Sequence, residues 1–187
     1  MLELEKINKT WTLFLDRDGV INHEKHLQYV LHYLEFQFYD GVKEALKNLS
    51  AIFGRLIIVT NQRGVERQLM TEEALLHIHQ EMLAEIRAAG GNIDAIFYCT
   101  SLNDEHPNRK PQTGMAILAR QSYPDIDFSR SIMIGNNLSD MQFGRNAGMF
   151  TVFVKTTSPD LPLPDPLIDL AYDDLPAFAE QVVSLHP

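Results

Sequence analysis

The sequence predicts a three-layer α/β domain in which helices cover both faces of a doubly wound, mostly parallel sheet. Short apolar segments of strand length alternate along the chain with longer segments of helical periodicity. This alternation requires parallel strands joined by right-handed crossovers. The chain has 187 residues, a length that fits one domain of ordinary size. We therefore expect a single domain over residues 1–187.

The expected strands are the short apolar segments Thr12–Leu15, Arg55–Thr60, Ala95–Tyr98, Ser131–Gly135 and Thr151–Lys155. The expected helices are Gly41–Leu49, Thr71–Ala89, Thr113–Gln121, Asp140–Ala147 and Leu175–Ser184. Thr71 precedes two glutamates, as in a helix cap, and Gly90-Gly91 can end that helix. The segment Ser158–Asp174 is rich in proline and aspartate, so we expect an irregular connection.

The composition excludes several classes of function. A net charge of −9 disfavours nucleic acid as a partner, although a local site can still bind a small phosphorylated metabolite. Cys99 is the only cysteine, so no intrachain disulfide can form. The apolar runs are too short to span a membrane, and the first ten residues are too charged for a signal peptide. We expect a cytoplasmic protein, monomeric or weakly oligomeric, that binds no membrane.

Two acids follow the first expected strand. Asp16 and Asp18 are two residues apart, so on an extended chain their side chains point the same way. Gly19 permits a tight turn that lets backbone N–H groups approach a phosphate. The pair suits phosphoryl transfer, with Asp16 as nucleophile and Asp18 as general acid and base. The motif alone is equally compatible with a solvated acidic turn or a helix cap.

Polar groups also follow three other expected segments, at the sheet edge where parallel strands place ligands. The Thr60 hydroxyl can bind a phosphoryl oxygen, though such a threonine is more often part of a turn. Lys110 stands just before a helix, where a cation is unfavourable unless it neutralises an anion. Oxygen-bearing side chains at Asn136 and Asp140 suit Mg²⁺. Four such coincidences favour an enzyme site.

These four motifs, in this order over Phe14 to Met149, resemble the haloacid dehalogenase (HAD) superfamily of phosphatases. The runs at Phe14–Asn22, Val59–Gly64, Arg109–Met115 and Gly135–Met141 are most similar to its heptose 1,7-bisphosphate and histidinol-phosphate phosphatases. The resemblance implies a HAD-like Rossmannoid fold and Mg²⁺ as cofactor. The phosphate or substrate ligands that we expect on this basis are Arg17, Thr60, Asn61, Gln62, Arg109 and Lys110. The expected metal ligands are Asp16, Asp18 through its carbonyl, Asn136 and Asp140.

The chain departs from that resemblance in two places. Asn136 stands where these relatives usually have a metal-binding aspartate, which predicts weaker Mg²⁺ binding unless Asp140 supplies the carboxylate. Only Cys99 and His106 remain where the relatives have a zinc loop, so we expect no zinc. No insertion is long enough for a large cap domain, which leaves the segment Asn22–Tyr39 as a partial lid.

Several functions remain open at this point. The first choice is a sugar phosphate such as D-glycero-D-manno-heptose 1,7-bisphosphate, followed by histidinol phosphate or another small phosphomonoester, and then a nucleotide. Asn136 also allows a homologue that binds a phosphorylated ligand without turnover. A two-component receiver domain is disfavoured, because its phosphorylated aspartate ends the third strand and Asp16 ends the first.

Overall fold

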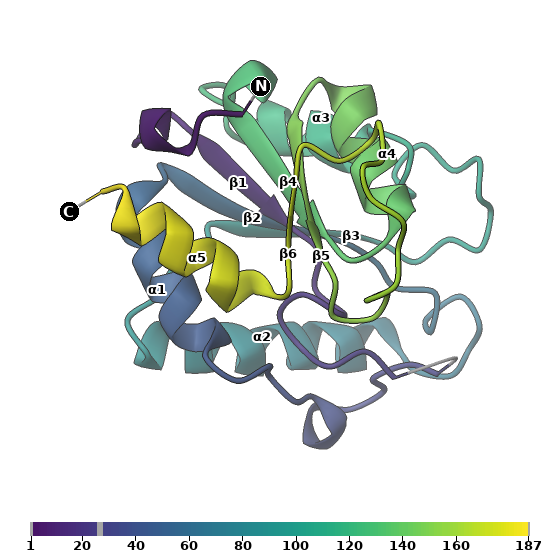
Figure 1. Cartoon of the computed structure of the whole chain (residues 1–187). Coiled ribbons are helices and arrows are strands. Elements are labelled where there is room, and N and C mark those ends of the chain that lie inside the picture. The colour runs from purple at the N-terminus through teal and green to yellow at the C-terminus, as the bar shows by residue number, and fades with distance from the viewer. Residues whose placement is uncertain (1, 26–27, 187) are drawn as a thin grey trace.

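The computed structural model describes residues 2–25 and 28–186, which contain six parallel strands in one sheet of order β3-β2-β1-β4-β5-β6 (Figure 1). The strands are β1 (Thr12–Leu15), β2 (Arg55–Asn61), β3 (Ala95–Cys99), β4 (Ser131–Gly135), β5 (Phe150–Val154) and β6 (Leu170–Tyr172). The α-helices are α1 (Val42–Ile52), α2 (Glu72–Ala88), α3 (Gly114–Ser122), α4 (Leu138–Ala147) and α5 (Leu175–Ser184). Short 3₁₀ turns span Leu4–Lys6, Tyr33–Glu35 and Phe128–Arg130.

Helices cover both faces of the sheet, as predicted. Alternate residues of β1 enter different cores: Leu13 and Leu15 pack with α1, α2 and α5, whereas Phe14 packs with α3 and α4. This alternation follows from the two-residue period of a strand. The central strands β1 and β4 are buried along their whole length, as parallel strands covered on both faces must be.

The expected helix ends are confirmed where a cap was predicted from sequence. The Thr71 hydroxyl accepts a 3.1 Å hydrogen bond from the backbone N–H of Ala74 and so caps α2. At the other end Gly90 has φ +89°, and its N–H donates to the carbonyl of Arg87. Helix α4 begins at Leu138, two residues earlier than expected, because Asn137 and Asp140 form a capping box.

One expectation about the fold is wrong. The segment Ser158–Asp174 is not irregular throughout, since Leu170–Tyr172 forms β6 and pairs in parallel with β5. Asp169 precedes the strand and accepts a 2.9 Å hydrogen bond from the backbone N–H of Thr151, which aligns the two segments. A three-residue strand between aspartates has too little apolar pattern to be detected in the sequence.

The strand order places a switch point between β1 and β4. From β1 the chain proceeds outward through β2 to β3, and then returns to continue from β4 in the other direction. Ligands of doubly wound sheets bind at the carboxyl ends of the strands that flank such a point. Asp16 follows β1 and Asn136 follows β4, so both lie at this position.

No helix in the described residues is long and apolar enough to cross a membrane.

Candidate active site

A pocket of about 160 Å³ opens at the switch point. The strand ends and loops contribute Asp16, Asp18, Thr60, Asn61, Gln62, Lys110, Asn137, Ser139 and Asp140, and the lid contributes Glu24, Lys25, Gln28, Tyr29 and Val30. The four sequence motifs therefore meet around one cavity. The pocket is smaller than the roughly 300–1,000 Å³ typical of sites that enclose a whole ligand. It suits the phosphoryl end of a larger molecule.

Asp16 lines this pocket and is held by backbone and side-chain contacts. Its backbone N–H continues the sheet by donating to the carbonyl of Ile134 at 2.9 Å. Its Oδ1 accepts a 2.7 Å hydrogen bond from the N–H of Arg17 and lies 2.9 Å from Nζ of Lys110. Both contacts use the same carboxylate oxygen. Burial raises the pKa of Asp16, the Lys110 charge opposes this, and the Asp140 carboxylate adds to it.

Lys110 links two buried carboxylates. Its Nζ lies 2.9 Å from Asp16 and 2.7 Å from Asp140 Oδ1, and 2% of its side chain is exposed. Burial works against the charged ammonium, but the Asp140 and Asp16 carboxylates outweigh this effect and raise the pKa of Lys110. The other Asp140 oxygen accepts from the N–H of Asn137 at 3.1 Å. Both oxygens of Asp140 therefore have partners, and its coordination of a metal stays a prediction.

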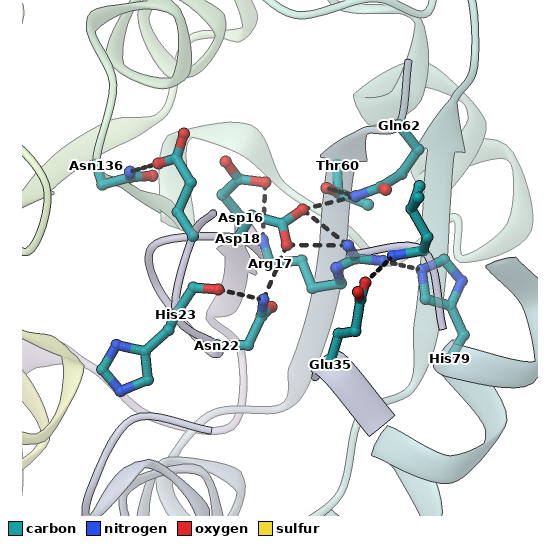
Figure 2. A network of polar contacts seen from close by, with 12 residues as sticks. Asp16, Arg17, Asp18, Asn22, His23, Glu35, Thr60, Gln62, His79 and Asn136 are labelled. Carbon is teal, nitrogen blue, oxygen red and sulfur yellow. Dashed lines mark hydrogen bonds and ion pairs between the residues drawn. The ribbon is translucent and has the colours of Figure 1, made fainter. Parts of the chain in front are cut away.

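Asp18 lines the same pocket and is held by three donors (Figure 2). Arg17 Nη2 donates to both carboxylate oxygens at 2.9 Å, and the amides of Asn22 and Gln62 donate at 2.9 and 2.8 Å. Burial alone would raise the pKa of Asp18, but the Arg17 charge and these hydrogen bonds outweigh it and lower the pKa. The resting carboxylate is thus ionised and fixed in place.

The side chain of Arg17 does not line the pocket, so contact of this residue with phosphate or substrate stays a prediction. Its side chain is completely buried, and its guanidinium extends away from the pocket, between Asp18 and the His79 ring (Figure 2). Nη1 donates to His79 Nε2 at 3.1 Å; because a guanidinium only donates, Nε2 accepts and the ring proton sits on Nδ1. Burial, and next the Arg17 charge, lower the pKa of His79 to about 3. The Arg17 side chain thus holds the Asp18 carboxylate in place.

Three of the expected ligands come from β2 and the residue after it. Thr60 Oγ1 accepts a 3.0 Å hydrogen bond from Gln62 Nε2, which leaves the hydroxyl proton to be donated elsewhere. Asn61 exchanges two hydrogen bonds with the backbone of Lys110, at 3.1 and 3.2 Å, and so ties that loop to the sheet. Gln62 is 4% exposed and bridges Thr60 and Asp18. Substrate contact by Asn61 and Gln62 stays a prediction.

Arg109 lies outside the pocket lining. Its Nε donates to Asp104 at 2.9 Å, and Nη1 donates to the carbonyl of Ser101 at 3.2 Å. These contacts brace the loop that ends at Lys110. The expected direct contact of Arg109 with substrate is therefore not supported by its position in the structure.

Asn136 is completely buried beside Gly19. Gly19 has φ +83°, and a Cβ built there would lie 2.1 Å from Asn136 Nδ2, so glycine is required for both reasons. Asn136 Oδ1 is buried and has no hydrogen-bond partner among the described residues. Asn136 is not among the residues that line the pocket, but such an oxygen fits the hard oxygen ligands that Mg²⁺ prefers. No three His, Cys, Asp or Glu side chains gather as a metal site in the described parts of the chain. Asn136 is one reason, because it provides an amide at the position where the relatives usually have a carboxylate.

Two contributors to the site were not predicted from the sequence. His79 lies on the buried face of α2, where a polar residue among Leu75, Ile78 and Met82 was the available signal. Glu24, in the lid, accepts a 3.1 Å hydrogen bond from Asn136 Nδ2, and no local pattern indicates this pairing. Elsewhere, the two residues that remain of the relatives' zinc loop are in contact, with Cys99 Sγ 3.5 Å from His106 Nδ1. The absence of zinc stays a prediction.

Comparison with known proteins shows the family to which the chain belongs. The family described as HAD-hydrolase-like matches residues 107–175. The D-glycero-alpha-D-manno-heptose-1,7-bisphosphate 7-phosphatase of Campylobacter jejuni is 40% identical over 146 residues, which cover 78% of this chain and 83% of the relative. The corresponding beta-heptose enzyme of Photorhabdus laumondii is 38% identical over 160 residues, covering 79% and 81%. The chain thus belongs to the HAD-superfamily phosphatases, in the family of the heptose-1,7-bisphosphate 7-phosphatases.

A solved structure shows the same architecture. The D,D-heptose 1,7-bisphosphate phosphatase from B. bronchiseptica, complexed with magnesium and phosphate, superposes with a TM-score of 0.84 at 29% identity. The match covers 93% of this chain and 98% of that one. The doubly wound fold without a large cap domain is therefore confirmed.

Proposed function

We propose that the chain is a Mg²⁺-dependent phosphatase that removes one phosphate from a heptose 1,7-bisphosphate through an aspartyl-phosphate at Asp16. One observation carries the proposal: Asp16 and Asp18 face a single pocket at the switch point, and Lys110 lies 2.9 Å from Asp16. The named relatives act on this substrate, and the magnesium and phosphate of the B. bronchiseptica structure support the cofactor.

In the first step an Asp16 carboxylate oxygen attacks phosphorus and forms a P–O bond, while the bond to the sugar oxygen breaks. Asp18 gives a proton to the departing alkoxide. The pKa of Asp18 is low in the free protein, but an anionic ester bound beside it favours the protonated form, because a like charge raises the pKa of an acid. The Thr60 proton and the Lys110 ammonium stabilise the negative charge on the phosphoryl oxygens.

In the second step water attacks the phosphorus of the aspartyl-phosphate. Asp18, now ionised, takes the proton of that water, the P–O bond to Asp16 breaks, and inorganic phosphate leaves. Arg17, Asn22 and Gln62 stabilise the ionised form of Asp18 that this step requires. Lys110 stabilises the Asp16 carboxylate as it is released.

Asp16, the Asp18 carbonyl and Asn136 Oδ1 would hold the Mg²⁺ ion. When bound, a divalent cation neutralises charge on the transferring phosphoryl group and favours the ionised form of Asp16. Asp140 remains a further candidate, although its present partners are Lys110 and the N–H of Asn137.

The small pocket supports a substrate whose sugar remains partly outside. The lid contributes Lys25 to the lining; its ammonium is paired with Glu35 at 2.8 Å and could exchange this partner for a second anionic group of the substrate. We also propose that residues 1–187 act as one domain, which the 2.8 Å contact between His186 Nε2 and the carbonyl of Ile7 supports. A small metabolite as the partner, rather than nucleic acid or membrane, accords with the net charge of −9. A cytoplasmic location and a monomeric or weakly associated state complete the proposal.

The test is phosphate release from a panel of substrates with Mg²⁺. The panel contains both anomers of D-glycero-D-manno-heptose 1,7-bisphosphate, other sugar phosphates, histidinol phosphate and nucleotides. We expect the highest kcat/KM with a heptose bisphosphate. A higher value for histidinol phosphate would move the assignment to that substrate. Tight binding of esters with no release from any of them would instead support a non-catalytic homologue.

A further inference from the structure

The Asn136 carboxamide has a fixed orientation in this protein. Its Nδ2 donates to Glu24 Oε2 at 3.1 Å and to Thr157 Oγ1 at 2.7 Å. A carboxylate can only accept, so the NH₂ group must face Glu24 and the oxygen must take the other position. Figure 2 shows the end of the Asn136 side chain directed to the side on which Asp16 lies. Glu24 therefore determines where Asn136 Oδ1 is presented.

Glu24 also changes the charge of the site. A carboxamide offers an oxygen but no charge, and the Asp16 charge is shared with Lys110 at 2.9 Å. Glu24 lines the pocket that contains Asp16 and lies within hydrogen-bond distance of the Asn136 amide. The glutamate thus places a negative charge one side chain away from position 136.

We propose that Glu24 is a positioning residue of the Mg²⁺ site: it orients Asn136 Oδ1 toward the ion and supplies the negative charge that the amide lacks. The proposal rests on the proposed function, because it takes Asp16 and Asn136 as the place where Mg²⁺ binds. Partners one contact removed from a metal ligand commonly change metal affinity by roughly 10–100-fold. The pair of Glu24 and Asn136 then has one negative charge, as would a neutral residue at position 24 paired with an aspartate at position 136.

The experiment measures Mg²⁺ binding by calorimetry, with no substrate present, in four proteins: wild type, Glu24→Gln, Asn136→Asp and the double variant. Mn²⁺ binding followed by electron paramagnetic resonance serves as the second measurement. Glu44→Gln is the matched control, because Glu44 is an exposed acid on α1 whose ion-pair partner is Lys47. Thermal unfolding in EDTA checks that each variant folds.

We expect Glu24→Gln to weaken Mg²⁺ binding about tenfold or more, and Glu44→Gln to leave it unchanged. In the double variant the charge returns to position 136, so the affinity recovers to at least the wild-type value. An unchanged affinity in Glu24→Gln overturns the proposal, as does a double variant that binds as weakly as Glu24→Gln. Because no turnover is measured, failure of the phosphatase assignment would appear separately, as absence of phosphate release by wild type.

Discussion

Lys110 Nζ lies 2.9 Å from Asp16 Oδ1 in a pair that is almost fully withdrawn from water. The same ammonium contacts Asp140, so one cation compensates two buried carboxylates. Removing one partner of such a pair leaves uncompensated buried charge, which costs more than loss of a surface ion pair. Lys110 is therefore expected to affect both folding and catalysis.

Lys110→Met should lower the free energy of unfolding by about 3–5 kcal/mol, because both carboxylates lose their counter-charge. It should also lower kcat/KM by about 10²–10³-fold, the usual effect of losing one group that stabilises developing charge. Urea denaturation and steady-state phosphate release measure the two effects. Lys110→Arg, which keeps the charge, should retain more of the stability; equal loss in both variants would count against the electrostatic explanation.

Thr60→Val should lower kcat/KM about 10²-fold with little change in stability, since the Thr60 hydroxyl is the donor assigned to a phosphoryl oxygen. Thr60→Ser keeps the hydroxyl and should retain most of the activity. The measurement is phosphate release at saturating Mg²⁺. Wild-type kinetics in Thr60→Val would show that another group binds the phosphoryl oxygens.

Gly19→Ala should abolish turnover. The added methyl group would lie 2.1 Å from Asn136 Nδ2, and φ +83° is unfavourable for alanine. Asn136 must therefore move and carry its oxygen out of place. Mg²⁺ titration of the purified variant should show weaker binding than wild type. Gly148→Ala, at the same φ of +83° but with open space around the added carbon, controls for backbone strain alone. Similar losses in both variants would contradict the steric account.

His79 makes stability depend on pH. Its pKa falls from 6.5 to about 3 on folding, so between these values the unfolded chain binds a proton that the folded chain does not. Stability is therefore highest above pH 6.5 and falls as the pH decreases, by up to about 1.4 kcal/mol per pH unit. Glutamine does not titrate, so His79→Gln lacks this pH dependence. The difference in the free energy of unfolding between wild type and His79→Gln, measured by urea denaturation, should therefore change by about 1.4 kcal/mol between pH 7.0 and 5.5. If that difference did not change with pH, His79 would have the same pKa in the folded and the unfolded chain.

The residues at the strand ends could be predicted from the sequence, but the contacts between distant segments could not. Asp16, Thr60 and Lys110 could be predicted because each follows an apolar segment or precedes a helix, and parallel strands bring such ends to one edge. The position of the Arg17 side chain could not be predicted from its sequence neighbours, because it depends on a contact with a distant segment. The Arg17 side chain is buried against His79, 62 residues away, and this contact arises only in the tertiary structure. The Glu24–Asn136 pair spans 112 residues and was undetectable for the same reason.

The central claim is that Asp16 carries the phosphoryl group during turnover. The most direct test is phosphate release by Asp16→Asn from heptose 1,7-bisphosphate with Mg²⁺, in protein whose thermal unfolding matches that of wild type. We predict a loss of about 10⁴-fold or more, as for removal of a nucleophile in other covalent mechanisms. Wild-type activity in Asp16→Asn would contradict the account.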